Sequence, residues 1–282
     1  MRYYWNSFKK VFSIIMGPVG IVAFVFPLSS VSNNNVFIRF LILLGFVILL
    51  FFIAACYTYY INHKNSVVVY SKGKTKIEFL YKDLEEILKE CFHEKSTIVV
   101  PINTYLPFVG DRDKLRETSI HHQVLYFLGN HGISIDSSFV LKLERKRIDL
   151  ADEDNCKIGN WFIISLRDYD IDSDMKFLFI ANGTLTREDG RINNKPPTRE
   201  DYLLTLQNLC DTISTQTENE EQVYIPLLGA GNARFGKNID AMKIISDILI
   251  FNKSQLLQHI SVFIDPRFKN EVHISALKYV NF

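Results

Sequence analysis

The stretch VYIPLLGAGNARFG (residues 223–236) joins a short apolar run to a turn that is rich in glycine. An apolar run that leads through such a turn into a helix, here expected from Lys237, is typical of strand-to-helix connections in α/β domains. Gly229, Gly231 and Gly236 let backbone amides approach an anion closely, and the positive end of the next helix favours its charge. The stretch lacks both the Gly-Lys-Ser/Thr of a P-loop and the Gly-x-Gly-x-x-Gly of a dinucleotide fold. It predicts a phosphate-binding turn; turn chemistry alone is the alternative.

From Ser66 onward, apolar runs alternate with amphipathic stretches, which is the pattern of an α/β sandwich. The runs expected as strands are rich in β-branched and aromatic residues: Val67–Tyr70, Lys76–Tyr81, Thr97–Pro101, Trp161–Leu166, Phe177–Ala181, Gln222–Pro226 and His259–Ile264. Apolar residues recur every three or four positions in the stretches expected as helices: Asp83–Cys91, Lys114–Gly129, Thr198–Thr215, Lys237–Phe251 and Pro266–Tyr279. A turn at Gly73 predicts that the first two strands form a hairpin. The polar stretch Arg187–Pro197 is expected to be a surface loop.

The N-terminal part of the chain is more hydrophobic than the rest. Hydrophobic residues make up 48% of the 282 residues, and the excess over an ordinary soluble domain lies almost wholly before Tyr60. Residues 11–28 carry no charge and, at ~1.5 Å per residue, reach about 27 Å as a helix, close to the thickness of a bilayer's hydrocarbon core. Residues 36–60 are apolar except for Arg39 near their start. We therefore expect a transmembrane helical hairpin over residues 1–62 and a ligand-sensing domain over residues 66–282.

Basic residues flank the two apolar segments but are absent between them. Arg2, Lys9 and Lys10 precede the first segment, and four lysines between residues 64 and 76 follow the second. By the positive-inside rule, we expect a multi-pass protein of the inner or plasma membrane whose N-terminus and C-terminal domain are cytoplasmic. We expect Arg39 to snorkel to the headgroups; lining a pore or pairing with lipid phosphate is the alternative. A signal peptide is the rival interpretation of the first segment, but no small-residue cleavage site follows it.

Charge and cysteine content argue against several other classes of protein. The 32 basic and 31 acidic side chains give a net charge of +1 without a broad basic field, so no nucleic-acid partner is expected. The four cysteines, Cys56, Cys91, Cys156 and Cys210, lack the spacing of a zinc site or a disulfide framework and are expected to be buried free thiols.

Polar residues near two further expected strands are candidates for the same site. Asn103 follows the strand that begins at Thr97, and its amide suits a sugar hydroxyl. Ser119-Ile-His-His-Gln123 lies on or near the next helix and suits a phosphate or a substituent; a solvated helix face is the alternative. No carboxylate at ligand spacing accompanies His121 and His122, so no metal is expected. Asp83 follows the second strand, where a helix N-cap is the default interpretation and a ligand contact the alternative.

In this order and spacing, these segments resemble a macro domain, the α/β/α module that binds ADP-ribose and related nucleotides. The resemblance covers most of Ser66–Phe282 and implies a three-layer sandwich with a mixed sheet. Asp83 falls where the family's Gly-Asp-Ile acid contacts adenine, and Asn103 matches the second Asn of its Asn-Ala-Ala-Asn segment near the distal ribose. Residues 229–236 match the family's second diphosphate loop, and Ile158-Gly159-Asn160 resembles the loop before its central strand.

The residues expected to bind the ligand are Asp83, Leu84, Pro101, Asn103, Ser119, His121, His122, Gln123, Gly159, Asn160, Leu228, Gly229, Ala230, Gly231, Asn232, Ala233, Arg234, Phe235 and Gly236.

Two departures from the family pattern bear on activity. Val100 stands where the family has the first Asn of its Asn-Ala-Ala-Asn segment, and the Gly-Gly-Gly loop of hydrolytic members is absent. The resemblance therefore implies a binding module without catalytic residues, cofactor or metal. The Ser-Ile-His-His-Gln variant is similar to a divergent macro branch of bacterial antiphage systems, where two membrane helices before such a domain resemble the effector of type II Thoeris defence.

For a chain of this kind, the resemblance implies that a partner TIR-domain enzyme makes an ADP-ribose conjugate, with histidine as the conjugated amino acid. Binding would drive homo-oligomerisation in the lipid bilayer, membrane disruption and abortive infection. Two rival functions stay open: a membrane-tethered ADP-ribosyl hydrolase that uses Asn103 and a nearby His, and a passive tether for ADP-ribosylated proteins.

Overall fold

The chain forms two compact units, Met1–Asn65 and Ser66–Phe282. This computed structural model describes residues 12–13, 36–62, 64–105, 117–135, 156–188, 191–195, 197–229 and 236–279. In the first unit, helix α2 (Val36–Asn62) is a single 27-residue helix that contains the second apolar segment. The first apolar segment, 11–28, lies outside the described residues except for 12 and 13. Among the residues that the structure describes, no helix meets the length and apolar character that a membrane crossing requires.

The second unit is built on an eight-stranded mixed sheet. Its strands are β1 (Ser66–Lys72), β2 (Thr75–Tyr81), β3 (Ser96–Asn103), β4 (Trp161–Ser165), β5 (Lys176–Glu188), β6 (Arg191–Lys195), β7 (Gln222–Pro226) and β8 (His259–Ile264). The order is β1-β2-β8-β7-β3-β5-β4, and β6 pairs with the far end of β5. Strands β2, β8, β7, β3 and β5 run parallel, whereas β1, β4 and β6 pair antiparallel with their neighbours. The α/β fold, the mixed sheet and the β1–β2 hairpin are confirmed.

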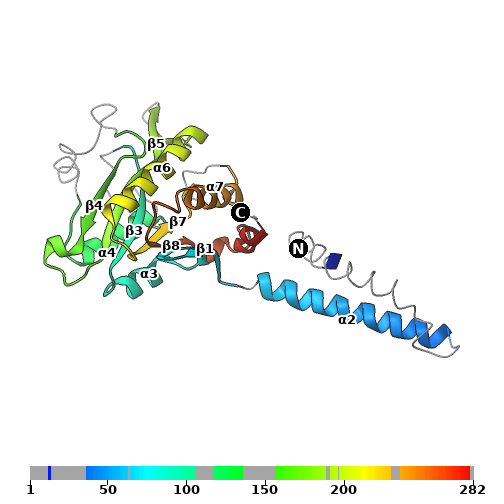
Figure 1. Cartoon of the computed structure of the whole chain (residues 1–282). Helices are drawn as coiled ribbons and strands as arrows, with labels where there is room; N and C mark the ends of the chain where they lie inside the picture. The colour runs from blue at the N-terminus through cyan, green and yellow to red at the C-terminus, as the bar shows by residue number, and fades with distance from the viewer. Residues whose placement is uncertain are drawn as a thin grey trace. The chain divides into compact units, whose positions relative to one another are not determined.

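Helices cover the two faces of the sheet (Figure 1). Buried residues of α3 (Leu84–Cys91) and α4 (Ile120–Asn130) form one hydrophobic cluster with Ile98, Val100 and Phe179 of the sheet. Those of α6 (Arg199–Gln216) and α7 (Asn238–Phe251) form the other, with Val99 and Leu178. Successive strand residues therefore point to opposite layers, as a pleated sheet requires.

Short polar residues begin three of these helices by accepting a backbone N–H bond. Asp83 caps α3 through the amide of Glu86. Ser119 caps α4 through the amide of His122. Thr198 and Asp201 form a reciprocal capping box at the start of α6, as the pattern at that position predicts.

A buried carboxylate ties three strands together at the amino end of the sheet. The Glu221 side chain is fully buried before β7; it accepts a hydrogen bond from the Thr97 hydroxyl on β3 and from the Glu218 amide at 2.9 Å. Lys176, the first residue of β5, places its Nζ 3.3 Å from the same carboxylate. A buried charge is tolerated when it is paired in this way, and the arrangement holds the register of β3, β5 and β7.

Three expected elements differ from the structure. The stretch 187–197 was expected to be a loop, but Arg191–Lys195 forms β6, which pairs with an extension of β5. The expected helix 266–279 is instead two 3-10 segments, η5 (Pro266–Phe268) and η6 (Ile274–Tyr279). Helix α4 begins at Ile120 rather than Lys114, because Ser119 caps it there. Cys56 is exposed, and the other three cysteines are buried.

Candidate functional site

The carboxyl ends of five parallel strands meet at one edge of the sheet. Asp83 lies just after β2, Asp265 just after β8, Leu228 and Gly229 just after β7, and Asn103 at the end of β3. The helix after β3, α4, packs on one face, and the helix after β7, α7, packs on the other. Neighbouring strands whose connections leave in opposite directions open a crevice at their carboxyl ends, where α/β sheets bind ligands. The site is therefore expected at the β3–β7 boundary.

The turn after β7 is held at its start by a buried hydroxyl. Tyr202 of α6 is fully buried, and its hydroxyl donates a 2.8 Å hydrogen bond to the Leu228 carbonyl. Burial raises the pKa of Tyr202, so the hydroxyl keeps its proton and remains a donor. Gly229 then adopts φ 76°, a left-handed conformation that favours glycine. The predicted site residues Ala230, Gly231, Asn232, Ala233, Arg234 and Phe235 lie outside the described residues.

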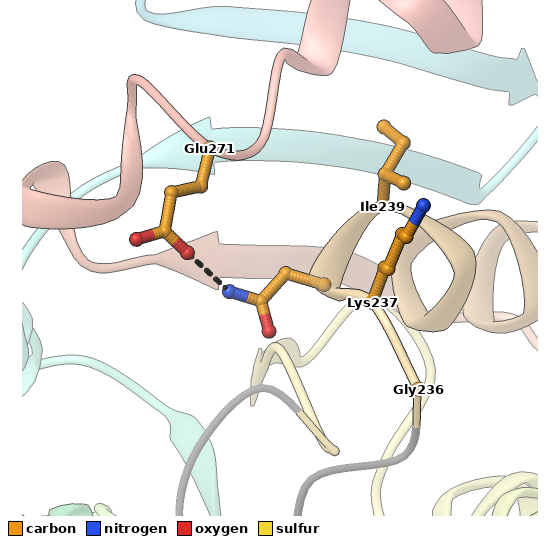
Figure 2. A pocket seen from close by; sticks show the side chains of 5 residues that line it. Gly236, Lys237, Ile239 and Glu271 are labelled. Carbon is orange, nitrogen blue, oxygen red and sulfur yellow. Dashed lines mark hydrogen bonds between the residues drawn. The ribbon is translucent and has the colours of Figure 1, made fainter.

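At the other end of this turn, a pocket of about 330 Å³ lies at the start of α7. Gly236, Lys237, Asn238, Ile239 and Glu271 line it (Figure 2). The Asn238 Nδ2 donates a 2.9 Å hydrogen bond to a Glu271 carboxylate oxygen. Of these residues, only Gly236 was predicted. Glu271 was not predicted, because it lies in the stretch expected as one regular helix. In the structure it lies in the turn between η5 and η6, and this turn brings it to the pocket.

Asp83 and Leu84, at the far side of this edge, have structural roles. The Asp83 Oδ1 accepts from the Glu86 amide at 2.8 Å, which is the N-cap interpretation, and the residue remains exposed. Leu84 is 4% exposed and belongs to the core beneath α3. Contact of either residue with a ligand stays a prediction.

A charged pair that the sequence reasoning missed follows β8. The Arg267 guanidinium donates to both carboxylate oxygens of Asp265. These hydrogen bonds hold the pKa of the Asp265 carboxyl below its usual value. Arg267 stays largely exposed at the edge where the strand ends meet, and its charge there is balanced by that of Asp265.

The segment around Ser119 and the histidines is divided between cap, core and surface. Ser119 accepts from the His122 amide at 3.1 Å. The His121 ring is 5% exposed and packs edge-on against Phe179 of β5, with centroids 6.2 Å apart. His122 and Gln123 are half-buried. The two neighbouring histidines therefore differ in burial. The predicted contact of His121 with a ligand would require a ring that is buried in this structure to become accessible.

At the end of β3, Asn103 is half-buried and pairs with Gly183 of β5, and Pro101 pairs with Ile180. Gly159 and Asn160 pack on the same part of β5, because the Gly159 amide donates to Ala181 and the Ala181 amide donates to Asn160, both at 2.8 Å. The structure therefore brings Asn103, Gly159 and Asn160 together around β5. Among the residues that the structure describes, no group of three or more His, Cys, Asp and Glu side chains is arranged to hold a metal ion.

Gly159 is held in place from α6. Its φ of 80° favours glycine, and Asn208 of α6 donates a 3.4 Å hydrogen bond to its carbonyl. A Cβ at this position would lie 2.4 Å from the Asn208 Nδ2. Gly159 is therefore required both by backbone conformation and by a close side chain.

The fold is similar to that of a solved macrodomain structure with a TM-score of 0.50. Two solved structures of mutants of a macrodomain from Oceanobacillus iheyensis are similar to this chain. The first mutant has a TM-score of 0.50 at 13% identity, covering 77% of this chain and 94% of that one. The second, solved with ADPR, has a TM-score of 0.49 at 13% identity, covering 76% of this chain and 98% of that one. No curated protein sequence matches.

One family model matches residues 85–265, which include β3, β5, β7, β8 and the strand ends around the crevice. Its description is "Thoeris protein ThsA, Macro domain". The match covers more than half of the chain and includes the glycine-rich turn that follows β7. This chain belongs to the family of Thoeris ThsA proteins with a macro domain.

Proposed function

We propose that this protein is an antiphage defence effector that senses an ADP-ribose conjugate, histidine-ADP-ribose, made by a partner TIR-domain enzyme. The observation that carries the proposal is the strand order that places the ends of β3 and β7 side by side, with the glycine-rich turn following β7, in a member of a Thoeris macro-domain family. The diphosphate lies over the amides of residues 229–236 and the start of α7, where an anion is favoured. The adenine lies toward Asp83, and the distal ribose lies toward Asn103.

The second part of the proposal is that the N-terminal unit places this sensor at a membrane. Its support is the sequence: residues 11–28 are uncharged, and residues 36–60 contain one charged residue, Arg39. Helix α2 runs through the second of these segments without interruption. The proposal therefore rests on the apolar sequence of the two segments and on the basic flanks, which favour a cytoplasmic domain.

Ligand binding then drives homo-oligomerisation and disruption of the bilayer. A ligand shifts an assembly equilibrium only by its differential affinity, so a tenfold preference for the oligomer contributes ~1.4 kcal/mol per site. Several sites in one oligomer add such contributions, which makes the response steep. In this proposal the protein binds its signal without turning it over.

The binding step is tested by calorimetric titration of the full chain in lipid nanodiscs with ADP-ribose and with histidine-ADP-ribose. We expect the conjugate to bind more tightly. Asn103→Ala removes an amide at the crevice and should weaken binding about tenfold, the effect of losing one hydrogen bond of ~1.4 kcal/mol. The matched control is Gln216→Ala, which removes an amide at the C-terminal end of α6. This end leads into the amino end of β7, opposite the expected site, so the variant should bind like the wild type.

The membrane step is tested by dye release from liposomes that contain the full chain. Release after addition of the conjugate, and none with Asn103→Ala, is the expected result. Conjugate binding without release would reject the effector function and favour a passive tether. Appearance of free histidine and ADP-ribose during the assay would instead identify a hydrolase.

A further inference from the structure

The pocket at the start of α7 carries a negative charge close to where the diphosphate is expected. Glu271 lines this pocket together with Lys237 and with Gly236, which ends the glycine-rich turn. The Glu271 carboxylate accepts the 2.9 Å hydrogen bond from the Asn238 Nδ2 (Figure 2). Because the Asn238 amide is neutral, this hydrogen bond orients the carboxylate without cancelling its charge.

The turn that carries Glu271 is anchored to the sheet. Tyr81, the last residue of β2, donates a hydrogen bond from its hydroxyl to the Val272 carbonyl and accepts one from the Ile274 amide at 3.1 Å. Val272 and Ile274 are buried in the hydrophobic cluster that also contains residues of α6 and α7. Since the residues that follow Glu271 are fixed in this way, the turn keeps the carboxylate at the start of α7.

The start of α7 is also an end that favours anions. Helices α3, α4 and α6 each begin with a side-chain oxygen that accepts a backbone N–H bond. Helix α7 begins after Lys237, whose ammonium group is only a donor and makes no such cap. The positive end of a helix attracts negative groups. The Glu271 carboxylate therefore offsets part of the attraction that this helix end has for the phosphates of a ligand.

We infer that Glu271 is a specificity-determining residue that disfavours ligands in proportion to their negative charge. The inference rests on the proposed function, in which the diphosphate lies at this pocket. The diphosphate of ADP-ribose is a diester with about two charges at neutral pH, whereas the terminal phosphate of ADP takes a further charge, which makes about three. Specificity can come from repulsion of the wrong ligand. Glu271 thus favours ADP-ribose and its conjugates over free ADP.

The pocket is small enough for this repulsion to act. Two unit charges ~5 Å apart in water repel strongly enough to change a binding constant about threefold. At an ionic strength of ~0.15 M, the field of a charge decays over about 8 Å. A pocket of about 330 Å³ keeps its contents within that range of a carboxylate on its wall.

The test is calorimetric titration of the full chain, in nanodiscs of zwitterionic lipid, with ADP-ribose and with ADP. Glu271→Gln removes the charge and keeps an oxygen that can accept from Asn238. It should tighten ADP-ribose binding about fivefold and ADP binding about fifteenfold, because ADP brings one more charge. In ~1 M salt, where the Debye length is about 3 Å, both gains should fall below about twofold.

Two variants serve as controls. Glu271→Asp keeps the charge and should retain the preference of the wild type for ADP-ribose over ADP. Glu94→Gln removes the same charge from an exposed position just before β3, at the opposite edge of the sheet, and should change the affinity for neither nucleotide. Glu271 is exposed, so the thermal midpoint of Glu271→Gln without ligand should equal that of the wild type.

The outcomes separate this inference from the proposed function. A wild type that binds neither nucleotide would reject the proposed function and, with it, the role of Glu271. Binding of ADP-ribose by the wild type with no gain in Glu271→Gln would reject the role of Glu271 alone. So would an equal gain for both nucleotides that persists in ~1 M salt, since repulsion between charges predicts neither result.

Discussion

Several residues at the strand ends that were expected to bind a ligand help to build this edge of the sheet. Asp83 and Ser119 each use a side-chain oxygen to cap a helix, and the His121 ring packs on Phe179. Capping was predictable from the sequence because it depends on residues three positions apart. The hydrogen bond between Asn238 and Glu271 was not, because it joins residues 33 positions apart in the chain.

Tyr202 provides a residue-scale prediction about the turn after β7. Tyr202→Phe removes the hydroxyl that donates to the Leu228 carbonyl and leaves that carbonyl without this donor. We expect the free energy of unfolding to fall by about 1–2 kcal/mol and ADP-ribose affinity to fall, since the turn is less fixed. Urea unfolding and calorimetry measure the two effects. Tyr70→Phe, on the half-buried β1, is the control; equal effects of the two variants would contradict the assigned role.

At the scale of elements, periodicity located the central strands well because they are buried on both faces. Strands β7 and β8 have the predicted bounds, and helices α3, α6 and α7 each begin within one residue of their predicted starts. Strand β6 was missed because its sequence, RINNK, is polar; it forms through pairing with β5 rather than through burial. The expected helix 266–279 became two 3-10 segments, which local apolar spacing did not distinguish from an α-helix.

The contact between Gly159 and α6 gives a prediction at this scale. Gly159→Ala introduces a Cβ that meets Asn208 and a left-handed conformation that Ala disfavours. Gly132 has a φ of 78°, and a Cβ there would have nothing within 4 Å. Gly132→Ala therefore carries only the cost of the left-handed conformation, about 1 kcal/mol. We expect Gly159→Ala to be more destabilising by at least another ~1 kcal/mol, and Asn208→Ala to restore part of that difference in a double-mutant cycle of urea unfolding. Equal costs for the two glycines would contradict a tight contact.

For the whole molecule, the division into two units gives the last prediction. The unit Ser66–Phe282 contains both hydrophobic clusters and the eight-stranded sheet. We expect residues 66–282, made alone, to unfold cooperatively and to bind ADP-ribose about as tightly as the full chain, yet to cause no dye release from liposomes. Circular dichroism, calorimetry and the release assay measure these properties. Loss of the folded state in the shortened chain would show that residues 1–65 are needed for its stability.

The strand order also determines when the sheet can form during synthesis. Strand β3, at the centre, has to pair with β5 on one side and with β7 on the other, and β7 is the later of the two in the chain. At about 5–20 residues per second, the ribosome takes on the order of ten seconds to make the chain between β3 and β7. The apolar run Ile98-Val99-Val100 of β3 has no partner strand from this pair until β5 is made, and its other side stays unpaired until β7 follows. Strand pairings across such a long sequence separation form slowly. Nascent chains of this protein should therefore depend on chaperones until β7 has left the ribosome.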